Sequence, residues 1–243
     1  PALPDRSIPS PDGQWILFNA GNTDNTVGVK LFNVNTGVIT EITRMTLLGK
    51  DPLMFGPVQD AVWSPNSQFI ALNTRNAAPG DELSTDIFIY RLSDNTLSRL
   101  TMDNARNYRV AWSPDSSRIV TTIDDCVVLS FNPMSINCNY RMEVFYITNS
   151  TPIISVDTTD LVNLSGGLNS VCLLEWSPDG RYVSFFVGCL EGGSPYDASE
   201  IWILDTNTAS LRQITNFTAE FVFNPTGPIY AIYDTAWYDT QTL

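Results

Sequence analysis

The chain has 243 residues, 43% of them hydrophobic, and a formal net charge of −13 at pH 7. It contains no histidine, which excludes a Ser-His-Asp or Cys-His catalytic centre within the chain and removes the commonest neutral metal ligand. Nucleic acids and anionic membranes attract basic surfaces, so this acidic chain is not expected to bind either. We therefore expect a chain without enzymatic activity, cofactor, metal or transmembrane segment.

A short motif recurs along the chain. Its copies are Ser10-Pro11-Asp12-Gly13, Trp63-Ser64-Pro65-Asn66, Trp112-Ser113-Pro114-Asp115, Trp176-Ser177-Pro178-Asp179 and a degenerate Phe223-Asn224-Pro225-Thr226. Measured from proline to proline, the copies lie 47 to 64 residues apart. Proline pre-sets φ at the second position of a turn, and glycine or asparagine accepts the left-handed conformation that follows. The motif therefore predicts a tight turn between two strands.

Apolar runs with a period of two follow each turn. Examples are 29–34, 87–92 and 201–205, and polar segments such as Asn35-Thr36-Gly37 close them. This alternation is typical of β-strands. Four short antiparallel strands repeated about every 50 residues are typical of the blades of a β-propeller. The chain is predicted to be all-β, a β-propeller of four-stranded antiparallel blades.

One domain spanning 1–243 is expected, with about five blades. Their approximate ranges are 7–46, 59–103, 108–162, 170–217 and 219–240. The first blade has a poor innermost strand, and the last shows two strands, 220–223 and 229–234. Incomplete end blades expose unpaired strand edges that invite aggregation. We therefore expect the propeller to belong to a longer chain or to be closed by a partner.

The motif Trp-Ser-Pro-Asp-Gly, followed by strands like Asp86-Ile87-Phe88-Ile89-Tyr90 and endings like Arg99-Leu100-Thr101, resembles the TolB-type propeller repeat, a relative of the WD repeat. The resemblance covers about Ser7 to Tyr233. The first copy departs from it at Pro9, where other copies carry tryptophan or phenylalanine, and the fifth lacks tryptophan and aspartate. The resemblance implies a bacterial extracytoplasmic protein. Similar repeats form the propellers of prolyl-oligopeptidase-type peptidases.

Three tryptophans, Trp63, Trp112 and Trp176, occupy one position of the repeat. We expect each to fill the wedge between neighbouring blades; the alternative, an aromatic carbohydrate platform, requires exposed rings. Trp202 and Trp237 lie outside this position and can face solvent. The repeated aspartates of the turns are expected to be turn-formers, because one per blade is too far from the next for an acid/base pair.

Four cysteines, Cys126, Cys138, Cys172 and Cys189, lack the C-x-x-C spacing. Cys172 and Cys189 flank the hairpin that turns at Asp179-Gly180, and Cys126 and Cys138 close the insertion of the third blade. We predict the disulfides 126–138 and 172–189, which imply an oxidising compartment such as the periplasm, the cell surface or the exterior. Free thiols in a cytosolic protein are the alternative.

Successive copies carry Asp60, Arg109, Leu173 and Glu220 three residues before the tryptophan position. The innermost strands line the central channel, whose mouth is the default ligand position of propellers. We predict that Asp60, Arg109 and Glu220 form a polar rim that contacts a partner; the alternative is solvated strand starts.

The leading functional hypothesis is a non-enzymatic protein-interaction or scaffold module, including a structural subunit of a surface assembly whose neighbours complete the open blade. A second hypothesis is the gating propeller of a serine peptidase whose catalytic domain lies outside this chain. A third is a carbohydrate- or small-ligand-binding propeller. Resemblance of fold does not decide among them.

Overall fold

The computed structural model of the chain describes residues 7–21, 26–46, 61–75, 85–103, 105–131, 134–164, 170–189, 200–216 and 236–237. Apart from one short helix, the regular elements of these residues are β-strands, which confirms the predicted all-β class. The chain forms two compact units, Pro1–Asn104 (unit 1) and Ala105–Leu243 (unit 2). Within the described residues, no helix is long and apolar enough to span a membrane.

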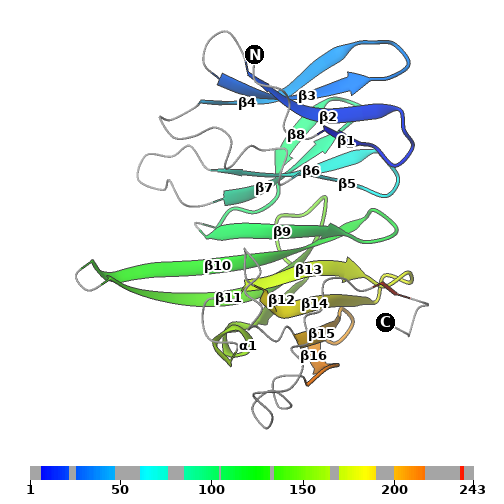
Figure 1. Cartoon of the computed structure of the whole chain (residues 1–243). Coiled ribbons are helices and arrows are strands. Elements are labelled where there is room, and N and C mark those ends of the chain that lie inside the picture. The colour runs from blue at the N-terminus through cyan, green and yellow to red at the C-terminus, as the bar shows by residue number, and fades with distance from the viewer. Residues whose placement is uncertain are drawn as a thin grey trace, which may run out of the picture. The chain divides into compact units, whose positions relative to one another are not determined.

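Unit 1 contains two antiparallel sheets of four strands, each joined in chain order (Figure 1). Blade 1 consists of β1 (Ser7–Pro9), β2 (Trp15–Gly21), β3 (Thr26–Asn33) and β4 (Ile39–Thr46). Blade 2 consists of β5 (Ala61–Trp63), β6 (Phe69–Arg75), β7 (Thr85–Arg91) and β8 (Thr96–Arg99).

Unit 2 repeats this plan. Blade 3 consists of β9 (Arg106–Trp112), β10 (Arg118–Phe131), β11 (Met134–Tyr146) and β12 (Ile154–Asp157), followed by helix α1 (Thr159–Leu164). Blade 4 consists of β13 (Ser170–Trp176), β14 (Tyr182–Cys189), β15 (Glu200–Asp205) and β16 (Ser210–Gln213). The predicted fifth blade lies outside the described residues except for 236–237, so the number of blades stays a prediction.

A serine side chain closes each predicted turn. In blade 4, the hydroxyl of Ser177 donates to Oδ1 of Asp179 at 2.6 Å and accepts the amide of Tyr182 at 2.8 Å. The same Oδ1 accepts the amide of Arg181 at 3.0 Å. Equivalent contacts close the turns that begin at Ser10, Ser64 and Ser113. Each turn therefore satisfies its own backbone and joins the first two strands of its blade.

The fourth residue of each turn is in the left-handed region. Gly13 and Gly180 have φ of 69°, whereas Ser67 and Ser116 have φ of 59° and 61°. A side chain in this region costs about 1–2 kcal/mol, a cost that glycine avoids. Ser67 offers a compensating contact, because its hydroxyl accepts the amide of Asp12 in blade 1 at 3.1 Å. The turn of one blade is therefore tied to that of its neighbour within unit 1.

The repeated tryptophans are buried, with exposed fractions of 7% for Trp63, 7% for Trp112 and 6% for Trp176. The indole Nε1 of Trp63 donates to the carbonyl of Ile8 at 3.1 Å, and that of Trp176 donates to the carbonyl of Ala111 at 3.1 Å. Each bond reaches back to the first strand of the preceding blade. Trp63 and Trp176 thus lie between the two blades of their unit, and burial leaves all three rings unavailable as a carbohydrate platform.

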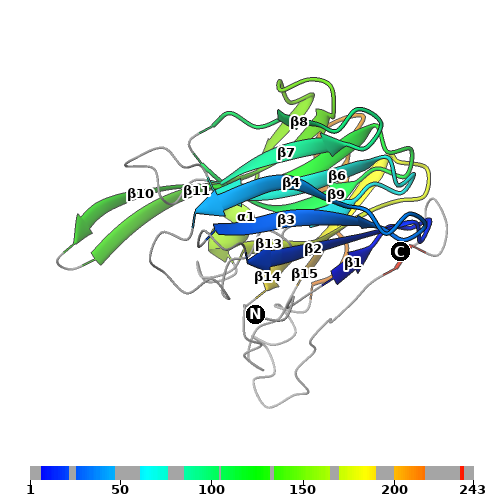
Figure 2. The same cartoon turned by 90° about the horizontal axis from the view of Figure 1, so that it is seen from above.

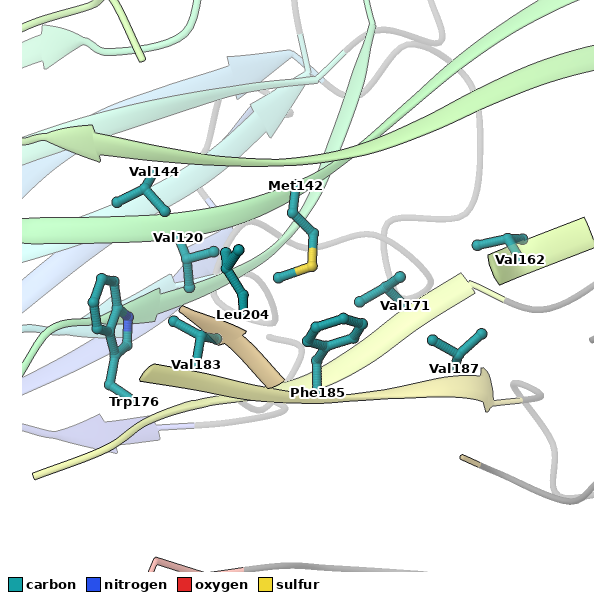
Figure 3. Close-up of a cluster of buried hydrophobic side chains, with 10 residues drawn as sticks. All are labelled: Val120, Met142, Val144, Val162, Val171, Trp176, Val183, Phe185, Val187 and Leu204. Atoms are coloured by element: carbon teal, nitrogen blue, oxygen red, sulfur yellow. The ribbon is translucent and has the colours of Figure 1, made fainter. Parts of the chain in front are cut away.

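Apolar side chains from blades 3 and 4 form the core of unit 2 (Figure 3). Val120 of β10 and Met142 and Val144 of β11 lie on one side of this cluster, and Trp176 and Phe185 of blade 4 lie on the other. All five are less than 9% exposed. Burial of such side chains supplies most of the stability of each unit.

A glycine-to-alanine pair tests the turn geometry. At Gly13 an added Cβ would meet no atom within 4 Å, so Gly13→Ala costs only the left-handed conformation. We expect the free energy of unfolding to fall by about 1–2 kcal/mol in chemical denaturation. Gly21→Ala is the matched control, because its Cβ also enters open space and its φ lies outside the left-handed region. An equal loss in both variants would contradict the assigned turn.

Trp176→Phe tests the wedge. The substitution keeps an aromatic ring but removes the donor to the carbonyl of Ala111. We expect it to lower the free energy of unfolding by about 1–3 kcal/mol, the usual effect of leaving a buried acceptor unsatisfied. The control is Trp202→Phe, a half-buried tryptophan on β15 that lies outside the repeated position. If the two substitutions cost the same, the indole hydrogen bond has no special role.

Candidate functional site

Arg109, a predicted rim residue, and Leu173, at the same position of the repeat, lie on neighbouring strands of unit 2. Arg109 on β9 is exposed, and Leu173 on β13 is 48% exposed. The two strands contact each other, and both residues precede the tryptophan of their strand by three positions. Asp60 and Glu220 lie outside the described residues, so the rim of Asp60, Arg109 and Glu220 stays a prediction.

Both strands bulge where these residues lie. On β9 the register moves from Val110 opposite Thr121 to Asn107 opposite Ile123, so two residues, one of them Arg109, face one residue of β10. On β13 it moves from Cys172 opposite Phe186 to Glu175 opposite Ser184. Leu173 is one of the two residues in that second bulge. Bulges bend a strand and redirect its side chains, and they are frequent next to functional sites.

The backbone at each bulge differs from that of a regular strand. The amide of Arg109 donates to the hydroxyl of Thr122 at 3.2 Å, a side-chain contact within the bulge. Leu173 has φ of 52°. The left-handed region is uncommon for non-glycine residues, and a bulky apolar side chain gains nothing there that offsets the cost. We call Arg109, Leu173 and their two bulges the inner-strand site.

A carboxylate with a raised pKa lies at the end of the pairing between β9 and β10. Asp124 is opposite Arg106 on β9 and Tyr140 on β11. Burial raises the pKa of Asp124 to about 6, and the positive charge of Arg106 opposes that rise only in part. Desolvation disfavours the charged form of a carboxyl group, so Asp124 changes charge near neutral pH.

The aspartates of the repeated turns have a structural role, because each accepts a backbone amide of its own turn. The hydrogen bond from Ser10 holds the pKa of Asp12 below its ordinary value, and the hydrogen bond from Ser177 does the same for the pKa of Asp179. For Asp115, burial raises the pKa, but hydrogen bonds from Ser113 and other donors outweigh it and the net pKa is lowered. Carboxylates held ionised by a turn are poor general acids.

Two further acidic residues serve as strand anchors. Asp86 on β7 forms an ion pair with Arg99 at 2.7 Å and accepts the hydroxyl of Thr101 at 3.3 Å. Glu200 on β15 accepts the hydroxyl of Thr215 at 2.6 Å. Both acids begin the third strand of a blade and are bonded near the end of the fourth. Among the residues that the structure describes, no group of three or more His, Cys, Asp or Glu is placed to hold a metal ion.

The structure contains the predicted disulfide Cys126–Cys138, which joins β10 and β11 at directly opposed positions. The second predicted bridge stays a prediction, because the described part of the chain does not include the side chains of Cys172 and Cys189. The strand register places Cys172 opposite Phe186 and Cys189 opposite Ser170, so their backbones are not directly opposed.

Trp237 occupies a place that the sequence did not indicate. Its ring stacks on Tyr182 with centroids 6.2 Å apart, and its Nε1 donates to the carbonyl of Glu175 at 3.4 Å. Glu175 precedes the serine of its turn by two residues, as do Ile8 and Ala111, the acceptors for Trp63 and Trp176. Trp237 therefore fills the wedge beside blade 4. No Ser-Pro follows it in the sequence, so the repeat motif gave no signal for this role.

Neither a protein-family model nor a curated protein sequence matches the chain. Solved structures do match it. The β-propeller domain of the Trilobed protease from Pyrococcus furiosus, which has an open velcro topology, matches with a TM-score of 0.55 at 10% identity, over 88% of this chain and 58% of that chain. The chain is a β-propeller. The identity of 10% shows the fold and not the function.

Two other solved structures also match the chain. Hydrazine synthase of Kuenenia stuttgartiensis matches with a TM-score of 0.53 at 14% identity, over 88% of this chain and 54% of that chain. TolB from Acinetobacter baumannii matches with a TM-score of 0.46 at 17% identity, over 86% of this chain and 42% of that chain. The second score is too low to distinguish a TolB-type propeller from others. The chain spans about half the length of the structures it matches.

Asp124→Asn tests the raised pKa. In the folded state the pKa of about 6 lies above the ordinary value of 3.8, so folding binds a proton and stability falls as pH rises from about 4 to 6. The substitution Asp124→Asn removes this pH-dependent loss of stability. Because Asp124 is partly exposed, we expect it to raise the free energy of unfolding by only about 1 kcal/mol at pH 7 and by nothing at pH 4.

The measurement is urea denaturation at half-unit steps from pH 4 to pH 8. Asp125→Asn is the control, because it removes the same charge from an exposed neighbour on β10. A difference between Asp124→Asn and the parent protein that is constant across this range would contradict the raised pKa.

Proposed function

We propose that this propeller is a non-enzymatic interaction module that binds a partner protein through its inner-strand site. The observation that carries the proposal is Leu173, an apolar side chain that is 48% exposed and held in a left-handed conformation. Such strain persists only where the surrounding structure enforces it, and strained residues cluster at functional sites. An exposed apolar residue beside an exposed arginine suits a protein surface, since interface cores favour apolar contacts and arginine.

The position of the site on the fold supports this function. In a propeller the blades surround a central channel, and the first strand of each blade is the one nearest to it. Arg109 and Leu173 lie on the first strands of blades 3 and 4. Both residues lie in a bulge of the first strand of their blade, so the two consecutive blades present them in equivalent positions. We propose that Asp60 and Glu220 continue this rim on the neighbouring blades.

Two features support an extracytoplasmic location for this module. The disulfide Cys126–Cys138 is of a kind that persists in oxidising compartments. The resemblance of the repeats to TolB-type propellers points to the same compartment. The absence of histidine supports a role without catalysis. We propose that the module acts as a scaffold within a larger extracytoplasmic assembly, with neighbouring subunits or further chain completing the ring.

A second candidate function is the gating propeller of a serine peptidase. The match to the propeller domain of the Trilobed protease supports it. Under this alternative, a separate catalytic domain supplies the serine and histidine, and the channel admits peptides. Peptidase activity that co-purifies with the native protein and is inhibited by a serine-directed reagent would favour it over the scaffold.

The inner-strand site is tested with Leu173→Asn and Arg109→Glu. Asparagine tolerates the left-handed conformation, so Leu173→Asn removes the apolar side chain while relieving strain. We expect partner binding to weaken at least about tenfold, while the free energy of unfolding stays unchanged or rises by up to about 1 kcal/mol. Loss of binding with gain of stability distinguishes a binding residue from a structural one.

The partner is captured from the native source on immobilised wild-type protein, identified by quantitative mass spectrometry, and titrated against each variant by biolayer interferometry. Leu97→Asn, which alters an aliphatic residue of β8 that is 36% exposed, is the matched control. A partner that binds both site variants as tightly as it binds the control and the wild type would refute the proposed site.

A further inference from the structure

The β10–β11 hairpin continues beyond its blade (Figures 1 and 2). Pairing of β10 with β9 ends at Asp124, and pairing of β11 with β12 ends at Arg141. The two strands then pair with each other as far as Phe131 and Met134. We call the described residues from the disulfide outward, 126–131 and 134–138, the arm. At about 3.3 Å per residue, the β10 side of the arm is about 20 Å long.

The arm carries no charged residue and exposes two large aliphatic side chains. No charged residue occurs from Val127 to Tyr140, although the whole chain has a net charge of −13. Val127 is 57% exposed and Leu129 is 65% exposed. Two large aliphatic side chains that lie two residues apart on a projecting element are more than the scattered exposed residues that any surface carries.

The arm is held in shape by a covalent bond. The disulfide Cys126–Cys138 joins its strands close to the point where the neighbouring strands end. A two-stranded hairpin without further support is marginally stable in water. The crosslink therefore fixes the arm before any contact is made, which reduces the entropy that binding would otherwise cost.

The geometry of the arm favours contact through side chains. The register shifts between Val128 and Ser130, so β10 has one extra residue there, Leu129. A bulge interrupts the regular spacing of backbone groups and so impedes the addition of another strand to this edge. The extra residue, Leu129, is 65% exposed, compared with 57% for Val127.

We propose that the arm is a self-association site that packs against the arm of a second copy of this chain. Two copies with a charge of −13 each repel one another, and repulsion is screened beyond about 8 Å at physiological ionic strength. Uncharged arms about 20 Å long let two copies touch while their acidic bodies stay farther apart than that distance. A two-fold axis brings Val127 and Leu129 of each arm into one apolar contact.

Other occupants fit the arm less well. A basic partner would be attracted to the acidic blades and would find no carboxylate between Val127 and Tyr140. A lipid bilayer would leave backbone groups at the edges of a two-stranded arm without hydrogen-bond partners, which is strongly unfavourable. A second copy offers an apolar surface of the same size and neutrality.

The test is sedimentation velocity of the full chain over a concentration series, comparing the wild type with the double variant Val127→Asp and Leu129→Asp. The wild type is expected to shift from 27.0 kDa toward twice that mass as concentration rises. The double variant is expected to self-associate at least about tenfold more weakly, because it loses apolar contact and adds like charges. Added salt should strengthen association of the wild type by screening repulsion.

The matched control is the double variant Val38→Asp and Ile39→Asp, which adds the same charges in blade 1 at residues that are 56% and 57% exposed. It should retain wild-type association. A wild type that stays at 27.0 kDa throughout, or an arm variant that associates as the control does, would overturn the proposal.

Two further measurements separate this proposal from its rivals. Cys126→Ser with Cys138→Ser should weaken association several-fold, since it removes the crosslink but keeps the apolar surface. Flotation with phosphatidylcholine vesicles should leave the wild type unbound; arm-dependent flotation would assign the arm to a lipid surface instead. Because neither arm variant alters Arg109 or Leu173, failure here would leave partner binding at the inner-strand site unaffected.

Discussion

The hydrogen bond from an indole N–H to the first strand of the preceding blade is the interaction on which the repeat depends. Three indoles make this bond, those of Trp63, Trp176 and Trp237. Each donates to the carbonyl that lies two residues before the turn serine of the neighbouring blade. Phenylalanine would fill the same wedge but would leave that carbonyl without its donor. The bond therefore couples the apolar filling of the wedge to a fixed alignment of neighbouring first strands.

In blades 3 and 4, the residue that covers the indole lies at the same position, five residues after the turn serine. In blade 3 it is Arg118, whose guanidinium lies 4.9 Å from the centroid of the Trp176 ring and donates to the carbonyl of Gly180 at 2.7 Å. In blade 4 it is Tyr182, which stacks on Trp237. A cation and an aromatic ring are interchangeable here because both are attracted to the face of an indole. The wedge thus tolerates sequence variation without losing its geometry.

Much of the fold was predictable because its determinants are local. The Ser-Pro-Asp-Gly turn carries its own hydrogen bonds between residues no more than five apart, so the turn can be located from a few letters. The bridge Cys126–Cys138 was predictable for a similar reason, since both cysteines flank one hairpin. Period-two alternation located the strands on either side.

The inner-strand site was only partly predictable. Counting from the tryptophans placed Arg109 and Leu173 at one repeat position, but neither bulge has a glycine or another signal in the sequence. The left-handed conformation of Leu173 depends on how β13 pairs with β14, which is a relation between strands. The role of Trp237 was also missed, because its acceptor Glu175 lies 62 residues earlier in the chain. Strands β10 and β11 are long because they continue to pair with each other beyond the blade.

The separation in sequence of these bonds has a consequence for how the chain folds. The first two strands of each blade are joined by a short turn, so these hairpins can form on a microsecond timescale from nearby residues. The indole bonds of Trp63 and Trp176 span 55 and 65 residues, and closing such loops is entropically costly until both partners are in place. Blades therefore form early and dock late. A nascent chain emerging from a ribosome or a translocation channel would acquire each blade before the wedge that locks it to the one before.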